Sequence, residues 1–123
     1  MPKNIRITTG SVVVDAELND TQTAGAVWDA LPIQGNGSTW GEEIYFRIPV
    51  NAELENGQEV VDLGDLGYWP PGQAFCLFFG LTPASRGDEI RPASEVTIIG
   101  KMTGDIGVLK GVSSGSPVVI QAV

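Results

Sequence analysis

Apolar and polar residues alternate along much of this chain with a period of two, which is typical of β-strands that bury one face. The clearest stretch is residues 12–18, where four apolar side chains share one side and Asp15 and Glu17 take the other. Residues 3–9 alternate more weakly, and Gly10 separates the two stretches. Residues 3–18 are therefore predicted to form a β-hairpin.

One segment has a helical period instead. Ala24, Val27, Trp28 and Leu31 recur at i, i+3, i+4 and i+7, so they share one face of a helix over residues 21–31. Asp20 or Thr21 can cap the first turn, and Pro32 ends the helix. We expect this helix to cover one end of a β structure, with Trp28 and Leu31 turned inward.

Strands resume after the helix. Residues 43–48 place Ile44, Phe46 and Ile48 on one face and Glu43, Tyr45 and Arg47 on the other. Residues 74–79 are apolar on both faces, as in a central strand. Further strands are predicted at residues 96–102, near 106–109 and at 118–122.

The connections between these strands carry turn residues. Asn36-Gly37 and Asn56-Gly57 indicate tight turns, and the two glycines of residues 64–67 indicate a loop. About eight short strands with one clear helix favour a closed barrel over a sandwich, because closure removes the exposed strand edges.

Length and charge narrow the possible partners. The 123 residues fit a single domain over residues 1–123, large enough to fold without a metal or a disulfide. Fifteen acidic residues face seven scattered basic ones, so the net charge is −8 and neither nucleic acid nor an anionic membrane surface is an expected partner. The first residues lack the continuous apolar stretch of a signal peptide, and no segment approaches the roughly 20 apolar residues that span a bilayer, so we expect a cytoplasmic protein.

The inventory of reactive side chains is short. The chain has no histidine and one cysteine, which excludes Ser-His-Asp triads, Cys-His dyads and Cys/His zinc sites. Cys76 lies in the apolar run 74–79 and is most simply a small buried side chain. Two acidic pairs, Asp62 with Asp65 and Glu42 with Glu43, could bind a metal or transfer protons, but exposed turns explain them more simply. No catalytic residue, metal or cofactor is predicted.

Three stretches resemble a known fold family. Residues 23–31, TAGAVWDAL, resemble the first helix of cyclophilins, and residues 45–49, YFRIP, resemble the strand that carries their catalytic arginine. Residues 64–83, GDLGYWPPGQAFCLFFGLTP, are similar to the signature of a small prokaryotic cyclophilin-like family of compact, atypical proteins without an established function. The resemblance covers nearly the whole chain. It implies an all-β protein with one or two short helices, folded as a closed eight-stranded cyclophilin-like β-barrel.

The resemblance to prolyl isomerases fails where their chemistry lies. In those enzymes a phenylalanine and a glutamine follow the arginine within a few residues, and residues 48–55 of this chain contain neither. Only Arg47 carries over. The protein is therefore expected to lack the full isomerase site, and we lean towards a protein that is not an enzyme.

A ligand site is expected on the outside of the barrel, where cyclophilins keep their groove. Its candidate residues are Tyr45 and Arg47 on the strand, with Tyr68 and Trp69 at the rim. Arginine binds carbonyls and carboxylates through its forked donors, and Tyr and Trp are common binding anchors. The simpler alternatives are an ion pair between Glu43 and Arg47, and an aromatic loop that only caps the barrel.

Three functions remain open. The first is a binding module that takes a small molecule or a proline-containing peptide in the outer groove. The second is a weak or divergent peptidyl-prolyl cis-trans isomerase. The third is an accessory domain of an amide-metabolising enzyme, since one fold can host unrelated functions.

Overall fold

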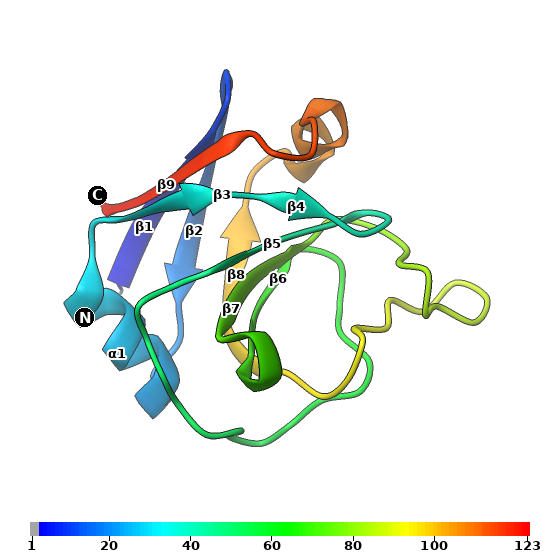
Figure 1. The fold of residues 1–123 in the computed structure, drawn as a ribbon, viewed down its shortest axis with the longest axis horizontal. Helices are drawn as coiled ribbons and strands as arrows, with labels where there is room; N and C mark the ends of the chain where they lie inside the picture. Colours follow the sequence, from blue (N-terminus) through cyan, green and yellow to red (C-terminus); the bar gives the residue numbers. More distant parts are fainter. Residues whose placement is uncertain (1–2) are drawn as a thin grey trace.

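The computed structural model describes residues 3–123 and shows one β-sheet curled into a barrel, with an α-helix and two 3-10 helices (Figure 1). The elements in chain order are β1 Lys3–Thr9, β2 Val12–Leu18, α1 Gln22–Ala30, β3 Ile33–Asn36, β4 Ser38–Thr39, β5 Glu43–Arg47, β6 Asp65–Trp69, η1 Pro70–Gly72, β7 Ala74–Phe78, β8 Thr97–Thr103, η2 Ile106–Gly111 and β9 Pro117–Ala122. The sheet order is β3-β9-β1-β2-β8-β6-β7-β5-β4. The predicted class, a mostly β barrel, is confirmed.

The N-terminal hairpin and the helix lie where the sequence predicts them. β1 and β2 pair antiparallel, with Thr9 opposite Val12 across the turn. Thr21 caps α1, because its side chain accepts a hydrogen bond from the Ala24 amide. The helix covers one end of the barrel, as expected (Figure 1).

The inward stripe of α1 is narrower than expected. Ala24 and Val27 are fully buried, whereas Trp28 and Leu31 are half-buried and pack against the edge of the core. The helix is only nine residues long. A short helix across the mouth of a barrel presents one narrow side to the interior, so the prediction for Trp28 and Leu31 is only partly right.

The chain closes the barrel at β3 and β4. These two strands are the edges of the nine-stranded sheet, but in the chain they are separated by Gly37 alone. β3 pairs with β9, and β4 pairs with β5, so one extended segment joins both edges. The sheet therefore has nine strands where eight were predicted, and it forms a nearly closed barrel.

The turn expected at Asn36-Gly37 is therefore wrong, because no hairpin forms there. The Gly37 amide donates to the Ser116 carbonyl, and its carbonyl accepts from the Gly115 amide, so the chain stays extended. A Cβ at Gly37 would lie 2.9 Å from Ile44 Cγ2 and 3.1 Å from Val118 Cγ2. The glycine is needed for close packing between β5 and β9 rather than for a reversal.

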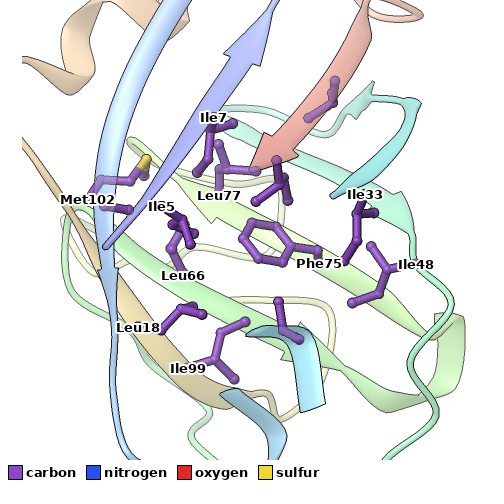
Figure 2. Packing of buried hydrophobic residues seen from close by; sticks show 14 of the residues in the cluster. Ile5, Ile7, Leu18, Ile33, Ile48, Leu66, Phe75, Leu77, Ile99 and Met102 are labelled. Carbon is purple, nitrogen blue, oxygen red and sulfur yellow. The ribbon is translucent and has the colours of Figure 1, made fainter. Parts of the chain in front are cut away.

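The inward side chains of the strands fill the barrel (Figure 2). Phe75 lies among the labelled side chains at the centre of this view and packs on Phe46, with ring centroids 5.8 Å apart. Leu109 of η2 is fully buried and belongs to the same cluster as Val27 of α1. Helical elements thus add apolar side chains to a core built mainly by strands.

Two other predictions from local sequence are wrong. The expected loop at residues 64–67 is largely strand, because β6 begins at Asp65. The expected strand near residues 106–109 is the 3-10 helix η2, whose first turn is capped by the Asp105 side chain. At residues 65–67, pairing with β7 and β8 overrides the local turn signal. Residues 106–109 pair with no strand of the described chain, so their apolar pattern does not produce a strand.

Replacing Gly37 by alanine tests the closure. We expect Gly37→Ala to lower the free energy of unfolding by about 1–3 kcal/mol, because the new methyl group must displace packed core side chains. Gly25→Ala is the matched control. Its methyl group meets nothing within 4 Å on an α-helix, so it should raise stability by about 0.5–1 kcal/mol. Urea unfolding measures both, and equal effects would contradict the closure role of Gly37.

Candidate functional site

The candidate site is on the outer face of β5, β7 and β6. In this sheet Arg47 and Trp69 both lie opposite Ala74, one from each side, and Tyr45 lies opposite Cys76. Directly paired residues point to the same face of a sheet. Tyr45, Arg47 and Trp69 therefore share the outer face, as expected.

Tyr68 does not belong to this site. It follows the alternation of β6 to the opposite face, lies opposite Phe75 and is 0% exposed. Its hydroxyl donates to the Val50 carbonyl at 2.7 Å and accepts from the Ala52 amide at 3.2 Å. The prediction of Tyr68 as a ligand contact is wrong, because the residues expected to form a loop are a strand.

A groove of about 250 Å³ opens on the outer face. Trp40, Tyr45 and Trp69 line it with aromatic surface, and Glu43 lies among them. The remaining lining comes from residues 92–96, at the end of the long connection between β7 and β8: Pro92, Ala93 and Val96. The site is therefore a largely apolar groove with one acidic side chain.

Trp69 is held in place at the groove. Its indole Nε1 donates to Ser94 Oγ at 2.7 Å, which joins β6 to the connection that forms the other wall. A Cβ at Gly72 would lie 2.7 Å from the ring, so only glycine allows η1 to approach it this closely. A ring fixed on both sides loses little freedom when a ligand binds.

Arg47 lies beside the groove rather than within its lining. Its side chain is exposed, and its guanidinium donates to Gln73 Oε1 at 3.3 Å. Within residues 3–123, Arg47 forms no salt bridge with Glu43, so the simpler alternative of an ion pair between them is wrong. The two side chains lie four residues apart along the strand, too far to meet.

Glu43 is the site residue that the alternation pattern placed incorrectly. It was expected to be exposed, but it is 5% exposed. It lies opposite Phe78, which is buried on the same outer face of the sheet. The signal was present in residues 74–79, which are apolar on both faces: a strand covered on both sides buries its neighbours as well.

Burial changes the acidity of this carboxyl group. Desolvation raises the pKa of Glu43 to about 7 from an ordinary 4.5, and the neighbouring Cys76 thiol lowers it by a smaller amount. The pKa of Cys76 is in turn raised, first by burial and then by the negative charge of Glu43. Cys76 is thus an inert thiol, and Glu43 is a carboxyl group that can change protonation near neutral pH.

A second apolar cluster lies beneath the groove. It consists of the buried residues Val61, Ala74, Cys76, Phe78, Ile90 and Val96, with Tyr45, Trp69 and Ile98 packed against it. Gly67 is part of this floor, since a Cβ there would lie 3.0 Å from the Phe78 ring and 3.2 Å from Val96. The floor is therefore packed, and the groove is formed between its side chains and the residue 92–96 wall.

The described residues offer neither a cluster of metal ligands nor a membrane-spanning helix. In the described part of the chain, no group of three or more His, Cys, Asp or Glu side chains could hold a metal ion. No helix among residues 3–123 is long and apolar enough to cross a bilayer. The chemistry available at the groove is apolar contact, aromatic stacking and the Glu43 carboxyl.

The chain is similar to known proteins in both sequence and structure. The sequence model of the family described as Cyclophilin-like matches residues 3–121. A hypothetical protein from Archaeoglobus fulgidus, solved in solution, is 44% identical and has a TM-score of 0.85; the match covers 99% of this chain and 95% of that one. No curated protein matches the chain.

The buried carboxyl group makes stability depend on pH. Between the unfolded pKa near 4.5 and the folded pKa of about 7, the native state holds a proton that the unfolded state has lost. Stability contributed by that proton is complete below this range and lost as pH rises through it, by roughly 3 kcal/mol. Glu43→Gln should therefore flatten the fall of stability with pH.

Urea unfolding from about pH 5 to about pH 8 measures this effect. Glu53→Gln removes an exposed carboxyl group and serves as the control. If Glu43→Gln and the wild-type protein lose the same free energy of unfolding over this pH range, the pKa of Glu43 is not raised in the folded state.

Proposed function

Because this chain belongs to the cyclophilin-like family, we propose that it is a binding protein that takes a small molecule or a short peptide in its outer groove. The observation that carries the proposal is the groove itself, where three aromatic side chains leave apolar surface open to solvent. Concave apolar sites with a few polar groups are the usual form of ligand sites. The same face bears Arg47, the residue carried over from the cyclophilin pattern.

Three physical features support binding at this place. The groove is walled by a strand on one side and by a connection tied to it through Trp69 and Ser94 on the other, so it exists before a ligand arrives. Tyr45 and Trp69 are partly exposed, and large aromatic side chains give much contact area for little entropy. Arg47 beside the groove can donate to a carbonyl that projects from it.

Catalysis of prolyl isomerisation has less support. Arg47 is followed by Ile48, which is buried, and Pro49, which is exposed, and residues 48–55 contain neither a phenylalanine nor a glutamine. The Arg47 guanidinium contacts Gln73, which lies beyond η1 in the chain. An arginine without those partners offers little that favours a twisted prolyl bond over the planar one.

A fragment library and proline-containing tetrapeptides, screened by amide NMR, test the binding proposal. We expect compounds that shift the Trp69 indole resonance, and we expect Tyr45→Ala to weaken them at least tenfold, or about 1.4 kcal/mol, because the variant removes one wall. Val13→Ala is the control, since Val13 is an exposed apolar residue on β2. Binders unaffected by Tyr45→Ala, or no binder at all, would refute the proposal.

A protease-coupled assay on Ala-Pro peptides tests the absence of isomerase activity. We expect a rate close to the uncatalysed one, because Arg47 has no catalytic partners. The result that contradicts this is a rate typical of cyclophilins that disappears in Arg47→Ala but persists in Arg86→Ala, a control at another exposed arginine.

A further inference from the structure

Glu43 is a buried carboxyl group without a cationic partner. The chain has seven basic residues, and within residues 3–123 none forms a salt bridge with it. Lys110 Nζ lies 3.7 Å from Oε2 of the neighbouring Glu42 instead, and Lys101 Nζ lies 3.7 Å from Asp65 Oδ1. A buried carboxyl group without a partner tends to hold a proton, but one that lines a groove can be paired and ionised by a cation from outside the chain.

The surroundings of Glu43 suit a positive charge. Trp40, Tyr45 and Trp69 line the same groove, and the faces of aromatic rings carry negative electrostatic potential. The net charge of −8 adds a long-range attraction for cations. An anion would have to approach both this charge and Glu43, so an anionic group does not fit here.

We propose that the groove binds an organic cation, an alkylated ammonium group that lies against Trp40, Tyr45 and Trp69 with Glu43 as its counter-ion. The inference rests on the proposed binding function and names the class of ligand. An alkylated ammonium fits better than a bare ammonium or a metal ion, because its alkyl groups replace the apolar contacts of the groove and carry little hydration to lose. Arg47 lies beside the lining and does not compete for Glu43.

The other titratable groups around Glu43 do not change this assignment. They are Cys76 on β7, Tyr45 on the same strand, Asp65 across β7 on β6, and the Arg91–Glu89 pair in the connection that forms the far wall. Cys76 stays a neutral thiol because of its burial. Arg91 is held by the Glu89 carboxylate at 3.1 Å. A ligand cation would therefore be the partner that favours the ionised form of Glu43.

A matched pair of probes tests the inference: choline, and its uncharged isostere in which a tert-butyl group replaces the trimethylammonium group. Amide NMR titration at about pH 8 should show choline binding at least tenfold more tightly, or about 1.4 kcal/mol. The indole resonances of Trp40 and Trp69 should move, and that of Trp28 on α1 should not. Glu43→Gln should reduce the preference to about two- to fivefold, which is what cation–π contact alone supplies.

The pH dependence gives a second readout that packing defects would not imitate. Choline needs the ionised carboxylate, so its affinity should rise by roughly tenfold from about pH 5.5 to about pH 8 in the wild-type protein and stay constant in Glu43→Gln. Glu53→Gln, an exposed carboxyl change, should behave as wild type. Trp40→Leu should weaken choline binding while leaving the pH dependence in place.

The contrary outcomes separate this inference from the proposed function. Equal binding of both probes, or a choline affinity that Glu43→Gln leaves unchanged, would overturn the cation assignment and leave the groove as a binding site. A groove that takes neutral fragments but not choline would do the same. If neither probe nor any fragment shifts Trp69, both proposals fail.

Discussion

The structure depends on a single extended segment that hydrogen bonds to both edges of the sheet. β3 pairs with β9, and two residues later β4 pairs with β5, so residues 33–39 convert an open sheet into a barrel. With both edges of the sheet joined to one segment, the strands surround the apolar side chains of the core. The geometry of Gly37 is what permits it, because Ile44 and Val118 from the two flanking strands occupy the space a side chain would need.

Closure also sets the position of the groove. With β5 fixed against β4 and β7, the side of β5 that faces away from the core must be covered by something else, and the long connection between β7 and β8 supplies the cover. Ile90 and Val96 of this connection, with Val61 of the connection between β5 and β6, form a second apolar cluster with Phe78 and Ala74. The cover is incomplete between Tyr45, Trp69 and residues 92–93, and this gap is the groove.

The same cover explains the chemistry of the groove. Glu43 lies at a boundary, too deep for water to stabilise its charge and too close to the opening to be sealed among apolar side chains. Its raised pKa follows from desolvation, without a neighbouring charge of either sign as its main cause.

The sequence by itself determined the class of fold, the hairpin of residues 3–18, the helix with its Thr21 cap, and the inward and outward faces of residues 44–48. These features depend on periodicity and on hydrogen bonds between residues close in the chain, which a linear pattern contains. The alternation also placed Tyr45 and Arg47 on one outer face, and the resemblance to cyclophilins placed Trp69 beside them. It placed Tyr68 there as well, because a one-residue difference between loop and strand reverses the face of a side chain.

Only the tertiary structure decided the closure at Gly37, the burial of Glu43 and the composition of the groove. Asn36-Gly37 has the local signal of a turn, but pairing with two distant strands holds it extended. Glu43 follows an exposed pattern within its own strand, but it is buried in a groove that it shares with Trp69 and Val96, which are far from it in sequence. Burial and desolvation depend on all the neighbours of a side chain in space, and no local pattern along the chain contains them.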